Sequence, residues 1–217
     1  MIVTIDGPAG SGKSTAARRL AERLGFHYLD TGAMYRAVAL ACLREGIELA
    51  DDAKVAAAAR RIEISFSAAR VSVDGIDVTA AIRTPEVTHG ASIVALNAGV
   101  REAMGLLQRK LAAGKQIVCE GRDQGTVVFP HADHKFYFNA DATERARRRL
   151  HELADQGDAA ALDEILAQIR KRDERDAQRS EAPLRAAVDA VHLDTSRKSA
   201  DEVLELLVDT VRGTSGE

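Results

Sequence analysis

The stretch GPAGSGKS, residues 7–14, decides the fold of this chain of 217 residues. It matches in full the phosphate-binding loop pattern G-x-x-x-x-G-K-[ST], and its neighbours suit it. The apolar run at 2–5 predicts a buried strand, and 13–24 predict an amphipathic helix with Leu20 and Leu24 on one face. A strand, a glycine-rich turn and a helix surround an anion with backbone N–H groups at the positive end of a helix dipole. We therefore expect this chain to bind a nucleoside triphosphate.

The loop residues have separate expected roles. Lys13 is expected to neutralise the terminal phosphates, and the hydroxyl of Ser14 is expected to ligate Mg²⁺. The whole loop is predicted to contact ATP: Gly7, Pro8, Ala9, Gly10, Ser11, Gly12, Lys13, Ser14 and Thr15.

The composition is that of an ordinary soluble domain. The chain is 46% hydrophobic and 29% charged, which is enough for a sizeable core. Its net charge of −3 argues against a broad nucleic-acid surface, although basic residues are dense at 145–149 and 170–179. We expect no nucleic-acid partner.

Cysteine usage and the N-terminal sequence indicate the compartment. Cys42 and Cys119 lie in apolar stretches without metal-ligand spacing, which favours buried reduced thiols over a disulfide or a redox pair. No signal-like segment precedes the first strand, and no apolar stretch is long enough to cross a bilayer. We expect a cytoplasmic protein without membrane contact.

Along the chain, an α/β pattern is interrupted once. The alternating residues at 62–66, 71–73 and 76–78, with Asp74-Gly75 before the last, predict a small antiparallel sheet. Helices at 85 and at 99–113 follow it. We therefore expect a parallel sheet flanked by helices, formed by 1–61 and 114–217, with an inserted subdomain at 62–113. The charged helical segment at about 150–179 has few large apolar residues and is expected to be a mobile lid, and the tail at 213–217 is expected to be disordered.

The strand at 117–119 ends in Glu120 and a polar loop, 121–125. Open α/β sheets bind ligands beyond such strand ends. Glu120 either holds Mg²⁺ through water or forms an ion pair with nearby arginines, and the sequence does not decide between these two roles.

The remaining pattern favours a small-molecule kinase over other nucleotide-binding classes. The base-reading N-K-x-D motif and D-x-x-G switch of GTPases are absent from suitable places, and the strand at Glu120 lacks the carboxylate pair typical of motors. Isolated arginines lie instead in separate loops and along a charged helix: Arg36, Arg101, Arg122, Arg172, Arg175 and Arg179. Any one of them suits a solvated helix face. Together with a phosphate loop they suit phosphoryl transfer between two anions, which needs cations on both.

The sequence resembles the bacterial cytidylate kinases, a nucleoside monophosphate kinase family, from about residue 2 to residue 212. The resemblance rests on GPAGSGKST at 7–15, LDTGAMYR at 29–36, EGRDQGTVVFP at 120–130, RDERDAQR at 172–179 with the following APL, and LDTS at 193–196. It implies ATP-dependent transfer of the γ-phosphoryl group to CMP or dCMP, a monomer, and an NMP-binding role for the inserted subdomain.

The resemblance also implies roles for individual residues. Thr31 and Tyr35 frame the acceptor nucleotide, and Arg36 and Arg122 bind its phosphate. Ser92, Arg101 and Asp123 read cytosine, Arg172 and Asp176 contact the ribose, and Arg179 acts at the transfer site. Lys13, Arg122 and Arg179 form the expected catalytic set. Ser92 is matched through its spacing to Arg101, and its other interpretation is a serine on a helix surface. Gln124 departs from the family pattern, which has an apolar residue there.

The chemistry of the base agrees with this assignment. The exocyclic amine of cytosine suits the carboxylate of Asp123 as acceptor, whereas uracil presents a carbonyl oxygen there. A site built in this way rejects uracil by leaving buried groups unpaired. A kinase of another monophosphate, and a non-enzymatic ATP sensor, remain as alternatives.

Overall fold

The computed structural model describes residues 1–67, 70–155, 161–179 and 181–213. The chain divides into two compact units, Met1–Leu29 with Gly114–Glu217, and Asp30–Ala113. The second unit ends where the predicted insertion ends but begins at Asp30 rather than at residue 62. The difference arises because the helices before residue 62 pack against helices of the predicted insertion. The functional division into core and inserted subdomain stays a prediction.

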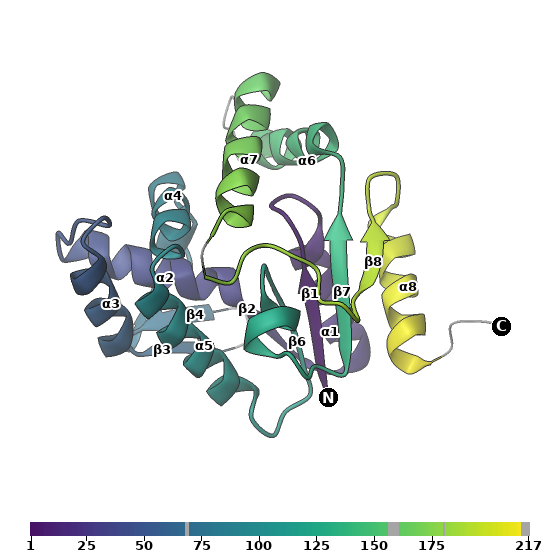
Figure 1. Cartoon of the computed structure of the whole chain (residues 1–217), viewed down its shortest axis with the longest axis horizontal. Coiled ribbons are helices and arrows are strands. Elements are labelled where there is room, and N and C mark those ends of the chain that lie inside the picture. The colour runs from purple at the N-terminus through teal and green to yellow at the C-terminus, as the bar shows by residue number, and fades with distance from the viewer. Residues whose placement is uncertain (68–69, 156–160, 180, 214–217) are drawn as a thin grey trace. The chain divides into compact units, whose positions relative to one another are not determined.

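A five-stranded sheet forms the centre of the first unit (Figure 1). Its order is β2-β6-β1-β7-β8, and the β1–β6, β1–β7 and β7–β8 pairs are parallel. The central strand β1 is completely buried at Val3, Thr4 and Ile5, and because successive side chains point to opposite faces, both faces of the sheet are covered there. The strand bounds are β1 Ile2–Asp6, β2 His27–Asp30, β6 Ile117–Gly121, β7 His134–Asn139 and β8 Val191–Asp194.

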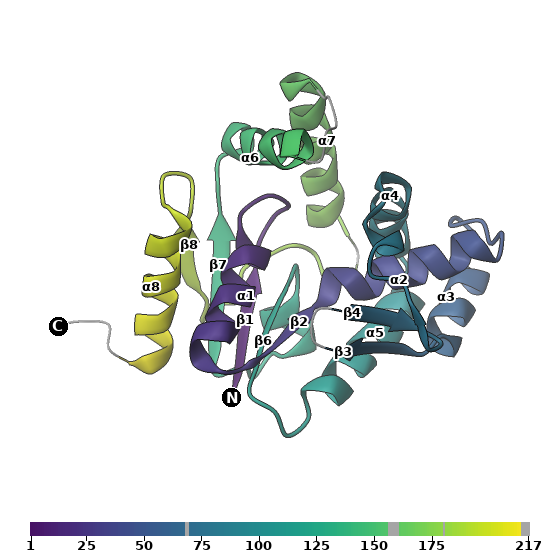
Figure 2. The same cartoon turned by 180° about the vertical axis from the view of Figure 1, so that it is seen from behind.

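The helices of the first unit differ in how they pack. Helices α1 (Lys13–Leu24) and α8 (Ala200–Arg212) cover the same face of the sheet (Figure 2). Helices α6 (Ala142–Asp155) and α7 (Leu162–Ala177) lie beyond the carboxyl ends of the strands and share a small separate core. These helices include most of the predicted lid segment, but its role as a mobile lid stays a prediction, and residues 156–160 of that segment lie outside the described residues.

The polar loop after β6 is more regular than expected. Gly121 still belongs to β6, and residues Gln124–Val128 form a short π-helical turn, η2. Asp123 precedes that turn, and its carbonyl oxygen accepts hydrogen bonds from the N–H groups of Val127 and Val128 at 2.9 and 3.2 Å. The loop that carries the predicted base reader is therefore fixed by its own backbone.

The second unit combines five helical segments with a small sheet. Its antiparallel sheet has the order β3-β4-β5, as the alternating pattern predicted. Val73 pairs with Ile76 across Asp74 and Gly75, whose φ angles of 49° and 79° are those of a two-residue hairpin turn. The element bounds are α2 Thr31–Arg44, α3 Asp52–Arg61, β3 Ile64–Ser67, β4 Arg70–Val73, β5 Ile76–Asp77, η1 Ala81–Arg83, α4 Pro85–Val94 and α5 Ala98–Ala112.

Two further expectations concern cysteines and membranes. Cys42 and Cys119 are both free and buried, as predicted. Burial raises the pKa of the Cys119 thiol well above its usual range, so that thiol stays protonated. Among the helices that the structure describes, none is long and apolar enough to cross a membrane. The C-terminal tail from residue 214 lies outside the described residues.

Candidate functional site

The phosphate loop has the backbone that its glycines predict. Gly10 and Gly12 have φ angles of 75° and 84°, which side-chain-bearing residues rarely adopt. At Gly7, a Cβ atom would lie 2.4 Å from the Phe138 carbonyl oxygen. The first hydrogen bond of α1 joins the Ala16 N–H to the Gly12 carbonyl oxygen at 3.0 Å. The backbone N–H groups before Ala16 are not used for hydrogen bonds within the helix, so they are available to bind an anion.

The side chains of the loop point toward its interior and toward β6. The Lys13 ammonium group donates to the Pro8 carbonyl oxygen at 2.8 Å, across the loop that it belongs to. The Ser14 hydroxyl donates to Glu120 Oε1 at 3.0 Å. Both residues predicted to serve the phosphates and Mg²⁺ thus lie at one place, and Glu120 lies beside the predicted metal ligand.

Lys13 is buried among both cations and carboxylates. Its side chain is enclosed by the site, and this burial, followed by the positive charge of Arg122, lowers the pKa of the ammonium group to about 7. Glu120 opposes that shift, and Arg172 adds to it. The residues that affect Lys13 come from β6, the loop after it and α7, so the fold gathers them around the phosphate loop.

Asp176 organises the predicted catalytic arginines. Its carboxylate, 1% exposed, accepts from Arg122 Nε at 2.8 Å through one oxygen and pairs with Arg179 through the other. Burial alone would raise the pKa of Asp176, but Arg122, Arg179 and Arg172 together hold that pKa below its usual value. Three of the sequence-predicted cations therefore lie around one carboxylate, close enough to Lys13 for two of them to affect its charge.

A second buried carboxylate supports the loop of the predicted base reader. Asp6, the last residue of β1, accepts from the Gln124 and Gly125 N–H groups at 2.9 and 2.7 Å. Burial raises the pKa of Asp6 to about 7, against the effect of these two hydrogen bonds. Asp123 is 4% exposed, and its charge raises the pKa of Asp6 further. Asp6 thus joins the start of the phosphate loop to the turn that follows Asp123.

Arg36, one of the two arginines predicted for the acceptor phosphate, lies in the first half of α2 in the second unit. Asp30 caps this helix, with one carboxylate oxygen accepting the Ala33 N–H at 2.8 Å. Its other oxygen pairs with Arg36 at 3.1 Å. Gly32 lets the Arg36 guanidinium lie against the helix start, because a Cβ there would be 3.1 Å from Arg36 Nη1. Thr31 is almost fully buried at the first position of this helix.

Two other predicted acceptor residues also meet within the second unit. The Arg101 guanidinium lies over the Tyr35 ring, 5.9 Å from its centroid, and donates to the Ala95 carbonyl oxygen at 3.3 Å. Ser92 does not lie on a helix surface: it is buried in α4, and its hydroxyl donates to the His89 carbonyl oxygen at 2.7 Å. Each unit therefore assembles its own part of the predicted residue set.

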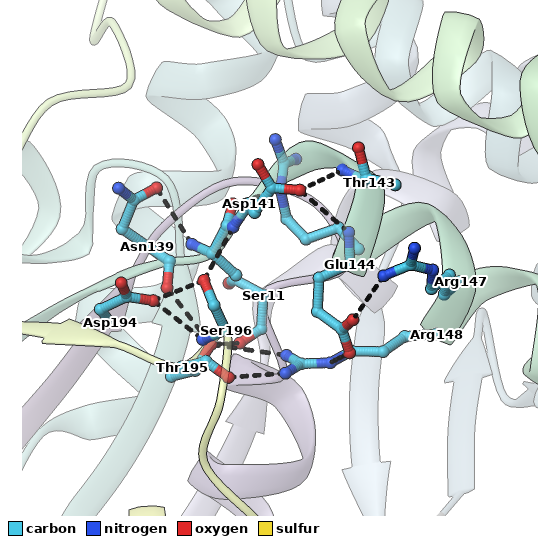
Figure 3. Close-up of polar contacts among 12 residues, drawn as sticks. Ser11, Asn139, Asp141, Thr143, Glu144, Arg147, Arg148, Asp194, Thr195 and Ser196 are labelled. Carbon is cyan, nitrogen blue, oxygen red and sulfur yellow. Dashed lines mark hydrogen bonds and ion pairs between the residues drawn. The ribbon is translucent and has the colours of Figure 1, made fainter.

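Several supporting residues escaped the sequence analysis. Asp6 carried a signal, since it is a carboxylate at the end of an apolar strand directly before the phosphate loop. Arg145 and Arg148 belong to the basic run that was noted without a role, and Thr195 belongs to the LDTS stretch. In the structure Arg145 Nη1 donates to the Ala9 carbonyl oxygen at 3.0 Å, and Thr195 and Arg148 meet beside the phosphate loop (Figure 3).

The described part of the chain holds no cluster of three or more His, Cys, Asp or Glu side chains with metal-ligand geometry. A Mg²⁺ ion does not need one, because it is commonly bound through one or two protein oxygens together with substrate phosphates and waters. The adjacent Ser14 hydroxyl and Glu120 carboxylate fit that kind of site.

The chain is similar to known proteins over nearly its whole length. A sequence model of the family described as Cytidylate kinase matches residues 3–213. The cytidylate kinase of Solibacter usitatus (strain Ellin6076) is 47% identical over 214 residues, covering 98% of this chain and 92% of that protein. The cytidylate kinase of Caldanaerobacter subterraneus subsp. tengcongensis is 45% identical over 216 residues, covering 99% and 96%.

Solved structures show the same fold at low sequence identity. A shikimate kinase from Bacteroides thetaiotaomicron aligns with a TM-score of 0.51 and 13% identity over 98% of each chain. An uncharacterized protein from Eubacterium ventriosum ATCC 27560 aligns with a TM-score of 0.57 and 12% identity, again over 98% of each chain. These matches, with the two sheets, confirm the predicted α/β kinase-type fold.

Proposed function

The chain belongs to the cytidylate kinase family, and we propose that it transfers the γ-phosphoryl group of ATP to CMP or dCMP. The products are CDP or dCDP, with ADP. The observation that carries this proposal is the cation cluster around the phosphate loop, in which Asp176 pairs with Arg122 and Arg179 and its charge also acts on Lys13. A protein that only senses ATP has no use for several arginines gathered beside its phosphate loop.

ATP and Mg²⁺ fit the residues that are present. The positive φ angles of Gly10 and Gly12 open a cradle that a Cβ atom would narrow, since at Gly10 it would lie 3.1 Å from Arg145 Cβ. Ser14 and Glu120 are the oxygen donors that would hold Mg²⁺, directly or through water. The metal ion, when bound, neutralises phosphate charge and orients the transferring group.

The chain's own residues supply the rest of the mechanism. Phosphoryl transfer is catalysed mainly by positioning and by charge stabilisation. We assign Lys13 to the β- and γ-phosphates, and Arg122 and Arg179 to the transferring group and the acceptor phosphate. Asp176 orients both arginines, in addition to the ribose contact that the family resemblance implies for it and for Arg172. Closure of α6 and α7 would exclude water, which otherwise competes as the acceptor.

For the acceptor nucleotide, we keep the residue roles that the family resemblance implies. Arg36 binds its phosphate, with Thr31 and Tyr35 beside it, and the present Asp30–Arg36 ion pair pre-orients the guanidinium. Asp123 accepts a hydrogen bond from the exocyclic amine of cytosine. Arg101 and Ser92 donate hydrogen bonds to the acceptor atoms of the ring. The burial of Ser92 and the stacking of Arg101 on Tyr35 support this assignment, because both side chains are held in place.

The proposal includes a cytoplasmic monomer without a nucleic-acid partner. The free buried cysteines support a reducing compartment and the net charge of −3 supports the absence of a nucleic-acid partner, whereas the monomer rests on the family resemblance. Size-exclusion chromatography with light scattering tests the monomer directly.

A coupled assay of ADP release tests the activity. CMP, dCMP, UMP and AMP are compared at equal concentration, with an acceptor-free reaction as control. We expect turnover with CMP and dCMP to exceed that with UMP and AMP by at least about tenfold, as a hydrogen-bonded base site requires. Preference for AMP or UMP would identify a different monophosphate kinase, and ATP binding without acceptor-dependent turnover would identify a sensor.

A further inference from the structure

The LDTS stretch at 193–196, which spans the end of β8, contacts the phosphate loop from outside. The Thr195 hydroxyl, on a side chain that is buried, lies 2.9 Å from the Ser11 carbonyl oxygen and 3.2 Å from that of Asn139. A hydroxyl donates only one hydrogen, and Asn139 already receives the Thr195 N–H at 2.9 Å. The nearer Ser11 carbonyl oxygen is therefore the acceptor of the hydroxyl.

This hydrogen bond controls the direction of one N–H group in the loop. A trans peptide is planar, so its C=O and N–H point in opposite directions. Holding the Ser11 carbonyl outward therefore aims the Gly12 N–H inward, toward the phosphates. Gly12, with φ of 84°, has no side chain to restrict this peptide, so the restraint must come from outside the loop.

Thr195 is itself held firmly (Figure 3). Arg148 of α6 donates to its carbonyl oxygen at 2.6 Å and approaches its hydroxyl oxygen at 3.4 Å. Beside it, Asp194 accepts the Ser196 N–H at 2.8 Å, and Ser196 in turn accepts the Asp141 N–H at 3.0 Å. The ends of β7 and β8 and the helix α6 thus converge on one threonine.

We propose that Thr195 is a positioning residue for the phosphate loop: its hydroxyl orients the Ser11–Gly12 peptide so that the Gly12 N–H binds the triphosphate. Arg145 does the same for the preceding glycine peptide through the Ala9 carbonyl oxygen, at 3.0 Å. This role rests on the proposed ATP-dependent activity. It concerns the phosphates alone and not the nucleotide's base or the acceptor.

The test compares Thr195→Val, which keeps the shape and removes the hydroxyl, with Thr195→Ser, which keeps the hydroxyl. Thr210→Val is the matched control, because the Thr210 hydroxyl donates to the Leu206 carbonyl oxygen within α8, at the surface. Calorimetry measures the affinity of the full-length protein for ATP and for inorganic tripolyphosphate, both with Mg²⁺. Steady-state assays measure KM for ATP and for CMP.

We expect Thr195→Val to weaken the affinity for ATP and for tripolyphosphate equally, by about 5- to 30-fold, because the Ser11 carbonyl oxygen loses its hydrogen-bond donor. KM for ATP should rise in proportion, KM for CMP should stay within about twofold, and Thr195→Ser and Thr210→Val should bind both ligands like the parent. Thr195→Ala serves as a second variant without the hydroxyl if Thr195→Val does not fold.

Two results would overturn the proposal. An unchanged affinity for tripolyphosphate in a folded Thr195→Val protein would show that Thr195 does not act on phosphate binding. An equal loss of affinity in Thr195→Ser would show that the shape of the side chain matters and its hydroxyl does not. The binding measurements do not need turnover. A parent protein that binds tripolyphosphate but does not phosphorylate CMP would therefore contradict the proposed function and leave the role of Thr195 to be judged on its own.

Discussion

Lys13 holds its positive charge weakly in the nucleotide-free protein. Burial and the neighbouring cation Arg122 lower the pKa of its ammonium group to about 7. A bound triphosphate brings several negative charges to the same place and must raise that pKa again. Nucleotide binding and protonation of Lys13 are therefore linked.

This linkage predicts proton uptake when ATP binds. At pH 8 the free protein has Lys13 largely neutral, so binding of Mg·ATP should take up close to one proton, about 0.9 for a pKa near 7. Calorimetric titrations in buffers of different ionisation enthalpy measure this number. Lys13→Met, which keeps the chain length without a titratable group, should show no uptake. An uptake near zero in the parent protein would mean that Lys13 is already charged.

At Asp123 the chemistry of the base can be tested directly. Asp123→Asn replaces an acceptor by an amide that can also donate. The value of kcat/KM should therefore fall more for CMP than for UMP. The CMP-to-UMP ratio of kcat/KM should fall by about 10- to 100-fold, corresponding to about 1–3 kcal/mol. Arg101→Ala should lower kcat/KM for CMP and UMP by the same factor, because both pyrimidines have the acceptor atom to which Arg101 would donate. If Asp123→Asn lowers kcat/KM for CMP and UMP by the same factor, other residues select the base.

Gln124 places a polar side chain in the interior at a cost in stability. Its side chain is 1% exposed, packs over Gly121, and leaves Oε1 without a hydrogen-bond partner among the described residues. Gln124→Leu should therefore raise the free energy of unfolding by about 1 kcal/mol, as removal of an unsatisfied buried polar group does. Urea denaturation measures it. The same change at the exposed Gln116 is the control and should have almost no effect.

At the scale of elements, α6 and α7 are the least supported part of the first unit. Their shared core is small, with only Ala146, Ile165 and Ile169 buried among the described residues, and the Arg145–Asp173 ion pair at 2.7 Å joins one helix to the other. Few buried apolar contacts favour local opening at low free energy.

We therefore expect fast hydrogen exchange in α6 and α7 of the free protein. CMP together with a non-hydrolysable ATP analogue should protect both helices, and either nucleotide alone should protect them less. Helix α1, packed against the sheet and α8, is the internal reference and should exchange slowly throughout. Equal protection with and without nucleotides would show that these helices are fixed.

The elements themselves could be predicted where a local pattern determines them. The glycines of the phosphate loop, the Asp74-Gly75 hairpin and the alternating strands around it each require a particular backbone within a few residues. The π-helical turn at Gln124–Val128 could not be predicted, because it depends on Asp6 accepting N–H groups that are distant in sequence.

The candidate site was predictable in its members but not in their contacts. A phosphate loop with scattered arginines indicates which residues act. The placement of Asp176 between Arg122 and Arg179, and of Thr195 behind Ser11, follows from tertiary packing that no spacing encodes. Supporting residues leave a weak sequence signal, since a single threonine or carboxylate has many ordinary uses.

For the whole molecule, Asp6 links stability to pH. Its pKa is raised from 3.8 to about 7, so the folded protein binds more protons at Asp6 than the unfolded chain between these values. Stability from this group is therefore present at low pH and is lost as pH rises from about 4 to about 7.

Asp6→Asn should remove that dependence. Between pH 5 and pH 7 the unfolding free energy of the parent should fall relative to Asp6→Asn, by up to about 1.4 kcal/mol per pH unit. Urea denaturation of both proteins across this range measures the difference, in which the other titrating groups cancel. Parallel pH profiles would show that Asp6 is ionised throughout.

The second unit enters the chain between two strands that are neighbours in the sheet. Strands β2 and β6 lie side by side, and the His27 N–H at the start of β2 donates to the Gln116 carbonyl oxygen just before β6 at 2.9 Å, so the chain leaves for the second unit and returns from it through two joined strands. Closing a flexible segment between fixed ends costs only about 0.6 kcal/mol more for each doubling of its length. Segments of very different size can therefore connect these two strands at little added cost in loop-closure entropy, which makes the interval between β2 and β6 a natural place for exchanging one acceptor-recognition module for another.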